Sequence, residues 1–271
     1  MHADLREVIA SFDGRAASYA RSDWHRRSAE RLVALSGLSP GMRVLDAGTG
    51  TGFVALAIAR VVGLQGSVVG VDVSRGMLKE ASALVRASGL TNIELIEADA
   101  EHLAQYASGT FDAVTCGTGL LYMSVPDALR EWYRLLKRGG IVAFSTIQAG
   151  SPRGARIFRE CAARFGVALR DPLEELGTTA ACRTSLEQAG FDAGAIVSET
   201  VNLSSADLAN AWESNFKSAS HPELRLLNAR EADKLRIEYL DALAREESVN
   251  PGALAQAGVL YALGRRGLGP V

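Results

Sequence analysis

The sequence predicts an α/β fold built on a doubly wound, mostly parallel sheet. Over residues 1–150, short β-branched or apolar runs alternate with amphipathic helical stretches. Strands that alternate with helices favour a parallel sheet covered by helices on both faces. A glycine-rich turn, "LDAGTGTGF" at 45–53, follows the first apolar run. Such a turn after a buried strand lets a ligand approach the backbone closely.

Five strands are expected in this first half, each bounded by turn residues: 42–48, 67–73, 92–99, 111–117 and 140–146. The helical patterns between them have recognisable ends. One helix follows the glycine loop at 53–62, and a second has Ser74 as N-cap and Gly89 as C′ residue. A third starts near Pro126 and stops at Gly139.

The second half is mainly helical. Helical patterns cover 152–166, 184–191 and a long block at 205–247, whereas 192–203 contains a strand and 258–266 forms the last one. The sequence shows no internal repeat and no low-complexity linker. We therefore expect the helices at 152–166 and 205–247 to be insertions that cover the sheet, not a separate domain.

Composition and charge exclude several functional classes. The 271 residues carry a formal net charge of −2, so no global basic field attracts nucleic acid or anionic lipid. No apolar run reaches the roughly 18 residues of a membrane-spanning helix, and the charged N-terminus lacks the apolar region of a signal peptide. Cys116, Cys161 and Cys182 form no metal-ligand pattern. We expect buried thiols in a reduced, cytoplasmic setting, and no metal.

An acidic residue closes each of the first three strands. Asp46 would place a carboxylate in the glycine loop, where it would repel a pyrophosphate and attract a cationic group. Asp72 follows Gly52 by 20 residues, where an acid can accept both hydroxyls of a ribose. Asp99 is placed to accept from the exocyclic amine of a base. The G-x-G-x-G spacing also departs from the dinucleotide pattern G-x-G-x-x-G, so a nucleoside with a cationic group is favoured.

Together these motifs resemble the class I S-adenosylmethionine-dependent methyltransferases over roughly residues 40–148. "VLDAGTGTG" is similar to their first motif, "GVDVS" to the ribose-binding strand end, and "EADAEHL" to the adenine-side segment. "LLKRGGIVAF" is similar to the turn into the fifth strand, with Arg138 in place of the usual proline. The resemblance implies S-adenosylmethionine as cofactor. It also implies a Rossmann-like doubly wound sheet, mostly parallel with an antiparallel last strand, and helical cap insertions.

We expect one methyltransferase domain over 1–271. Its parts are a helical lead-in at 1–40, a cofactor-binding core at 41–148, a helical cap at 149–183 and 204–250, and the last helix and strands at 184–203 and 251–271.

The resemblance further implies a set of cofactor contacts. The residues concerned are Tyr19, Asp46, Gly48, Thr49, Gly50, Gly52, Asp72, Val73, Met77, Asp99, Ala100 and Cys116. Asp46 and the first two loop glycines would contact the methionine part, and Asp72 the ribose. Val73, Met77, Asp99 and Ala100 would surround the adenine, and the Cys116 backbone would face the cofactor amine. Two alternatives stay open: Gly52 could serve only helix packing, and Met77 could be simple core.

The loop after the fourth strand, "CGTGLLYM", lacks the signatures of several acceptor classes. Families that methylate base or glutamine amines resemble "[D/N]PP[Y/F]" there, cytosine enzymes carry Pro-Cys, and protein arginine methyltransferases carry two glutamates. "STIQAGSPRG" holds no acid for a metal-assisted catechol site. We therefore expect a small, largely apolar organic acceptor, with C-, O- and N-methylation all open. Catalysis would come mainly from positioning and desolvation.

The segment that contains "FDGRAASY" resembles the lead-in of ubiquinone/menaquinone-type methyltransferases, in which Tyr19 would fold over the methionine end. The acceptor pocket would lie between this segment, residues 119–123 and the helical insertions. Candidate acceptor contacts are Trp24, His25, Leu120, Tyr122, Trp212 and Phe216. Tyr122 and His221 are the two candidates for a general base, and each can instead be structural.

Other functions stay open. With no convincing base, the fold could bind the cofactor as a scaffold or catalyse a cyclisation without methyl transfer. Nicotinamide-dependent reduction is a third possibility. The sequence leaves the oligomeric state open, a homodimer included.

Overall fold

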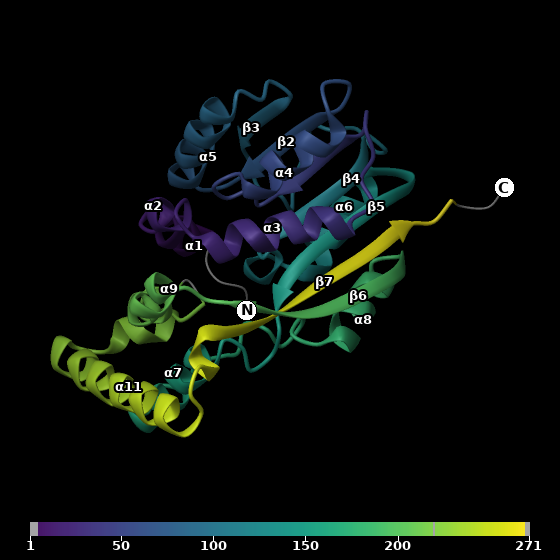
Figure 1. Cartoon of the computed structure of the whole chain (residues 1–271). Coiled ribbons are helices and arrows are strands. Elements are labelled where there is room, and N and C mark those ends of the chain that lie inside the picture. The colour runs from purple at the N-terminus through teal and green to yellow at the C-terminus, as the bar shows by residue number, and fades with distance from the viewer. Residues whose placement is uncertain (1–4, 219, 269–271) are drawn as a thin grey trace.

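The computed structural model describes residues 5–218 and 220–268 and confirms the predicted α/β fold. Residues 1–4 of the expected lead-in and 269–271 of the expected last segment lie outside this range. Figure 1 shows one twisted sheet between helices, with further helices gathered beyond one end of its last strands. The seven strands run in the order β3-β2-β1-β4-β5-β7-β6. Their bounds are β1 Arg43–Ala47, β2 Ser67–Asp72, β3 Ile93–Glu97, β4 Phe111–Gly117, β5 Leu136–Ile147, β6 Phe191–Asn202 and β7 Gln256–Arg266.

Strands β1 to β5 pair in parallel, and β7 runs antiparallel to both β5 and β6. The expected antiparallel last strand is therefore confirmed. In the register, Asp46 of β1 lies opposite Gly70 of β2 and Thr115 of β4, and Asp72 lies opposite Glu97 of β3. The acidic strand ends thus share the edge at which parallel sheets bind ligands.

Apolar side chains fill both faces of the sheet. On β1, the fully buried Val44 and Leu45 belong to separate core clusters, because neighbouring strand residues point to opposite faces. Helices α3 Asp23–Leu35 and α4 Phe53–Val62 pack in the Val44 cluster. The Leu45 cluster contains residues of α6 Val125–Leu135 and α8 Thr179–Gln188.

The N-terminal helices are fastened to α5 Arg75–Ser88. Helices α1 Leu5–Asp13 and α2 Ala16–Tyr19 both contact α5. The Asp13 Oδ1 accepts from the Ser74 Oγ at 2.6 Å and from the Gly76 N–H at 2.8 Å. Because Ser74 is the N-cap of α5, this carboxylate ties the N-terminal segment to the start of that helix.

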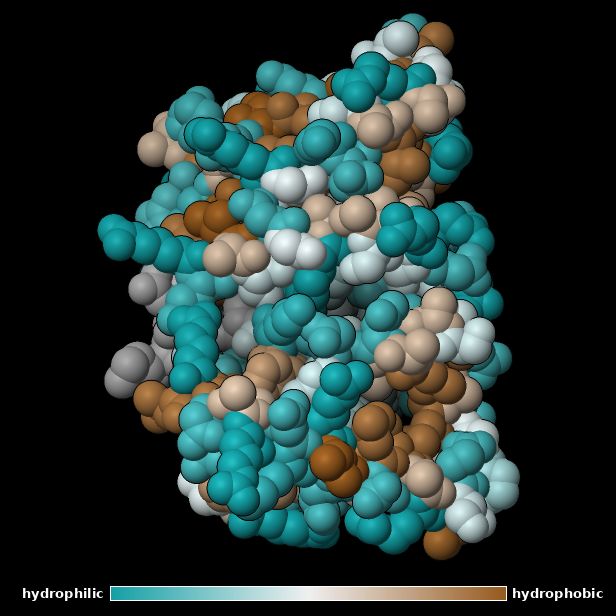
Figure 2. Space-filling view, turned by 90° about the vertical axis from the view of Figure 1, so that its left-hand side faces the viewer, coloured by the Kyte–Doolittle hydropathy of each residue, from teal (hydrophilic) through white to brown (hydrophobic). Residues whose placement is uncertain are grey.

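The cap is a separate layer of helices at the end of β6 and β7 (Figure 1). It comprises α7 Arg153–Arg164, α9 Ser205–Ala209, α10 Ala211–Phe216 and α11 Ala229–Val249, with the short turn η2 Pro222–Leu226. Its own core contains Phe158, Trp212 and Tyr239. Figure 2 shows hydrophobic residues gathered in the lower part of one face, at the level of the cap, among mostly hydrophilic neighbours.

Some element bounds differ from the predictions. Ser74 and Gly89 cap α5 as expected, but α6 ends at Leu135 because β5 begins at the next residue. Helix α8 starts before the predicted 184–191, since Thr178 caps it by accepting from the Ala181 N–H. The expected block at 205–247 is divided into α9, α10, η2 and α11. A capping box at Ser204 starts the block, and another at Asn228 starts α11.

Candidate functional site

A cavity opens where β1, β2 and β4 end, and we call it the strand-end cavity. Its empty volume is about 1050 Å³ with its open mouth included, which suits a small-molecule ligand. Nine of the twelve residues predicted for the cofactor line it: Tyr19, Gly48, Thr49, Gly50, Asp72, Val73, Met77, Asp99 and Ala100. The structure thus gathers most of the predicted set around one space.

The glycine loop exposes its backbone to this cavity. Gly48 has φ +66° and Gly50 has φ +54°, a region that L side chains rarely adopt. A Cβ on Gly48 would lie 3.2 Å from the Met123 Cε, whereas one on Gly50 would meet no heavy atom within 4 Å. The loop conformation therefore requires glycine and leaves room for a ligand beside Gly50.

Asp72 presents a carboxylate at the end of β2. Its Oδ2 accepts from the Gly50 N–H and its Oδ1 from the Ser74 N–H, both at 2.8 Å. Burial raises the pKa of Asp72, and these two N–H donors oppose the rise. Each carboxylate oxygen can accept a further hydrogen bond, so the side chain suits a pair of ribose hydroxyls.

Asp46 lies beneath the loop, not in the cavity. Its fully buried carboxylate accepts from the Thr49 Oγ1 at 2.7 Å and from the Thr115 Oγ1 at 2.9 Å, and it is not among the lining residues. Burial raises its pKa to about 7, and the two threonine hydroxyls oppose the rise. The expectation that this carboxylate faces the ligand and repels a pyrophosphate is therefore corrected. Asp46 holds the loop, and Asp72 and Asp99 are among the acidic residues that line the cavity.

Two other predicted cofactor residues also lie outside the cavity lining. Gly52 is the N-cap of α4 with φ +86°, and a Cβ there would lie 3.2 Å from the Ala81 Cβ of α5. This contact supports the alternative that Gly52 serves helix packing. Cys116 is fully buried, burial raises its pKa to about 12, and 117–119 line the cavity in its place. Met77 is 1% exposed and also lines the cavity, so it is both core and wall.

A second cavity, which we call the cap cavity, lies between the N-terminal helices and the cap. Its empty volume is about 1310 Å³ with its mouth included, and apolar side chains such as Trp24, Leu208 and Leu243 line it. Tyr19 and His25 line both cavities. They therefore form a shared wall between the two spaces.

The predicted acceptor and base residues divide into two groups. Trp24 and His25 line the cap cavity, and Tyr122 lines the strand-end cavity with its ring edge-to-face on Phe12 at 4.9 Å. The structure does not bring the others to either cavity: Leu120, Trp212, Phe216 and His221. Leu120 packs in the sheet core. Trp212 stacks on Phe216 at 4.7 Å in the cap, and the buried His221 stacks on Phe158 at 6.2 Å. Packing accounts for these four side chains.

The sequence reasoning missed three polar residues near the site: Asp13, Ser22 and Asp207. Asp13 is the acid of the quoted "FDGRAASY" segment. Asp207 belongs to the capping box that begins at Ser204, so a Ser-x-x-Asp pattern marks it in the sequence. Ser22 precedes α3 as its N-cap residue. The proximity of Ser22 and Asp207 depends on how the cap packs, which no local pattern encodes.

Comparison with known proteins gives the family. A model described as "Methyltransferase domain" matches residues 44–140. The demethylmenaquinone methyltransferase of Listeria welshimeri is 34% identical over 162 residues, which are 58% of this chain and 67% of that protein. The chain belongs to the class I S-adenosylmethionine-dependent methyltransferases. The demethylmenaquinone methyltransferase of Geobacillus kaustophilus is 35% identical over 144 residues, which are 52% of this chain and 60% of that protein. Part of each relative thus lies outside the match.

A solved structure, that of the [4+2]-cyclase SpnF, has a TM-score of 0.56 and 22% identity, with 90% of this chain and 82% of that chain covered. This likeness concerns the fold. The family's cofactor is S-adenosylmethionine, and the strand-end cavity fits it. The left-handed glycines leave backbone room, and Asp72 and Asp99 offer carboxylate oxygens at neighbouring strand ends. Within 5–218 and 220–268, no cluster of side chains could hold a metal ion. No helix of the described chain is both long and apolar enough to span a membrane.

Proposed function

We propose that the protein transfers the methyl group of S-adenosylmethionine to a small, largely apolar organic acceptor bound in the cap cavity. The observation that carries this proposal is the shared wall of Tyr19 and His25, which puts the cap cavity directly beside the strand-end cavity. The apolar lining by Trp24, Leu208 and Leu243 suits such an acceptor. The named activities of the curated relatives, which methylate demethylmenaquinone, agree with this acceptor class.

Bound S-adenosylmethionine supplies an already activated methyl group on a sulfonium. The chain then has to hold the acceptor in line and keep water out. Tyr19 and Tyr122 close the strand-end cavity with Phe12, since the Phe12 ring contacts both tyrosines at 5.9 and 4.9 Å. A cytoplasmic location, which agrees with the three buried free cysteines, is part of this proposal.

A substitution that fills the cap cavity tests the acceptor site. Ala155 lines this cavity from α7, whereas Ala163 is exposed on the same helix. Ala155→Phe should abolish methylation of an apolar hydroxylated aromatic acceptor, detected as a gain of one CH₂ by mass spectrometry. Binding of S-adenosylhomocysteine, measured by calorimetry, should stay unchanged. Ala163→Phe is the matched control and should behave as the wild type. Full activity in Ala155→Phe would place the acceptor elsewhere.

The alternative is a protein that binds the cofactor as a scaffold or cyclase. The same assay separates the two functions. A cyclised product keeps the mass of its precursor, and a scaffold leaves the acceptor unchanged.

A further inference from the structure

His25 occupies the wall between the two cavities. Its ring contacts two aromatic rings, with centroids 3.7 Å from Trp24 and 4.3 Å from Tyr19. These contacts fix the plane of the imidazole. Because the ring lines both cavities, it faces the space of the proposed acceptor and that of the cofactor at once.

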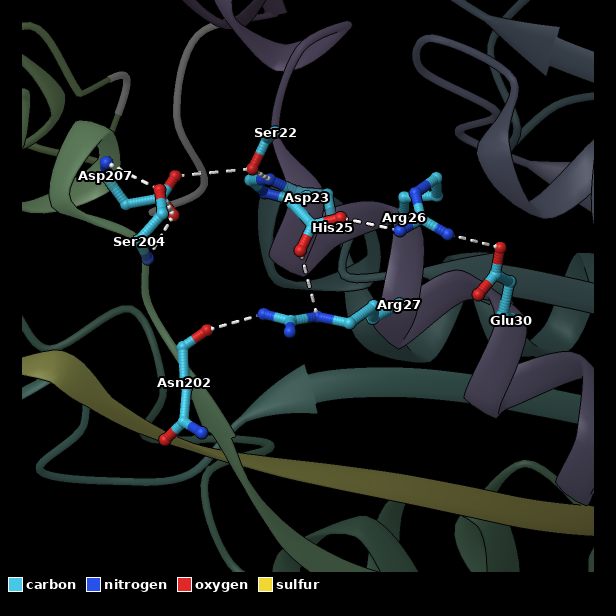
Figure 3. Close-up of polar contacts among 9 residues, drawn as sticks. All are labelled: Ser22, Asp23, His25, Arg26, Arg27, Glu30, Asn202, Ser204 and Asp207. Atoms are coloured by element: carbon cyan, nitrogen blue, oxygen red, sulfur yellow. Dashed lines mark hydrogen bonds and ion pairs between the residues drawn. The ribbon is translucent and has the colours of Figure 1, made fainter.

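One ring nitrogen of His25 is engaged by a short polar chain (Figure 3). The Nδ1 lies 2.7 Å from the Ser22 Oγ, and the Ser22 hydroxyl donates to the Asp207 Oδ1 at 3.4 Å, the longer of the two links. The Asp207 Oδ2 accepts from the backbone N–H and the hydroxyl of Ser204. The chain therefore joins the N-terminal segment to helix α9 of the cap.

The number of available protons links the histidine tautomer to the direction of the Ser22 hydroxyl. A carboxylate only accepts, and a serine hydroxyl has a single proton. If the Ser22 proton points to Asp207, the Ser22 oxygen accepts from His25. In that arrangement the Nδ1 carries the hydrogen, and the Nε2 keeps its lone pair. No group in the described chain hydrogen-bonds to this Nε2.

The charged side chains that neighbour His25 on α3 pair with other groups and do not bond to Ser22 or Asp207. Arg26 bridges Asp23 and Glu30, and Arg27 pairs with Asp23 and donates to the Asn202 carbonyl of β6 (Figure 3). Burial lowers the pKa of His25 to about 3, the Asp207 carboxylate opposes this shift, and Arg15 adds to it. The imidazole is therefore neutral at pH 7. Burial disfavours its protonated form, and the Asp207 carboxylate is the group that opposes this effect.

We propose that the His25 Nε2 is the general base of this site and that the acceptor carries an aromatic hydroxyl. Ser22 and Asp207 are positioning residues that keep the lone pair on the Nε2. The inference rests on the proposed function. The acceptor O–H bond breaks and its proton moves to the Nε2. The electron pair left on the acceptor oxygen would form the bond to the methyl carbon, and the carbon–sulfur bond of the bound cofactor would break with its pair left on sulfur. Asp207, through Ser22, stabilises the imidazolium until solvent takes the proton.

Nitrogen NMR of ¹⁵N-histidine-labelled protein tests the tautomer without any acceptor. The chain has four histidines, and His25→Asn identifies the relevant signals. We expect a protonated Nδ1 and an unprotonated Nε2 in the wild type. Ser22→Ala should remove this preference, whereas Glu30→Gln, which changes an exposed acid on the same helix, should keep it. A wild type protonated at the Nε2, or an unchanged tautomer in Ser22→Ala, would overturn the proposal.

Kinetics test the base itself. His25→Asn keeps a hydrogen-bond donor near Ser22 but has no basic nitrogen. If the His25→Asn variant does not fold, His25→Gln is used in its place. Turnover of a hydroxylated acceptor should fall by about 10²- to 10⁴-fold, with S-adenosylhomocysteine affinity unchanged. Ser22→Ala and Asp207→Asn should shift the acid limb of the pH–rate profile, to which Tyr19 and Arg15 also lie close. Full turnover in His25→Asn would refute the base. If the wild type methylates no acceptor, the proposed function is wrong. The NMR experiment needs no acceptor and therefore still tests the tautomer of His25.

Discussion

Asp46 shows how a residue buried under a ligand loop makes stability depend on pH. Its carboxyl lies between Thr49 and Thr115, and burial raises its pKa from 3.8 to about 7. Between these values the unfolded chain loses a proton that the folded chain keeps. The contribution of Asp46 to stability is therefore fully present below about pH 3.8 and is lost as the pH rises to about 7.

Asp46→Asn should remove this dependence. The difference in the free energy of unfolding, wild type minus variant, should fall by up to about 1.4 kcal/mol per pH unit as the pH rises from 4 to 7. Urea denaturation of both proteins at pH 5 and pH 8 measures it. The other titrating groups are common to both proteins and cancel. A difference that is equal at the two pH values would contradict the raised pKa.

Local pattern predicted most of the lining of the strand-end cavity but only part of the acceptor side. Asp72 and Asp99 follow strand ends, and Gly48 and Gly50 sit in a turn, so sequence spacing alone places them. Residues such as Trp212 were expected at the site because they are large and aromatic. These side chains instead pack in the separate hydrophobic core of the cap. The sequence predicts His25 as an acceptor contact and not as a base, because its partner Asp207 lies 182 positions away along the chain.

At the scale of elements, Gly52 sets how closely α4 approaches α5. The residue combines φ +86° with 3.2 Å between its would-be Cβ and the Ala81 Cβ. Gly63, at the other end of α4, has φ +64° and nothing within 4 Å of its would-be Cβ. A comparison of alanine variants at Gly52 and Gly63 therefore separates two costs: the backbone strain of a left-handed residue and the steric clash between the helices.

Gly52→Ala should therefore destabilise the protein more than Gly63→Ala, whose loss should lie in the range of about 1–3 kcal/mol for a strained backbone. The midpoints of thermal or chemical unfolding compare the two variants directly. Equal losses would show that α5 moves away at no cost and that Ala81 does not restrain the loop.

Most element types followed from periodicity, but their ends did not. The apolar spacing of 126–139 continues past Leu135, and only the pairing of Leu136 with Phe111 turns the chain into β5 there. Likewise, the helical pattern over 205–247 does not form one helix. The elements α9, α10 and η2 are short, and α11 begins anew at the Asn228 capping box.

For the whole molecule, the separate cap core predicts separate stability. Trp212 packs on Phe158 at 5.7 Å and on Phe216 at 4.7 Å, away from the clusters that cover the sheet. Proteins open in such cooperative units with different free energies. The sheet and the cap should therefore respond differently to the loss of this side chain.

In native-state hydrogen exchange, Trp212→Ala should speed exchange in α7, α10 and α11 and leave β1 and β4 as in the wild type. Truncation of a buried Trp costs about 3–5 kcal/mol, and this loss should lower the free energy of opening of the cap. Leu226→Ala, at a side chain that is 86% exposed, serves as the control and should change neither region. Equal acceleration in strands and cap would mean that the chain opens as one unit.

The shared wall has a thermodynamic consequence for the two ligands. Tyr19 and His25 belong to the same N-terminal segment, which Asp13 anchors at the start of α5. If the ligand that binds first orders that segment, it leaves less conformational entropy for the second ligand to remove. Coupling of this kind is reciprocal, so the cofactor must raise acceptor affinity by the same factor by which the acceptor raises cofactor affinity.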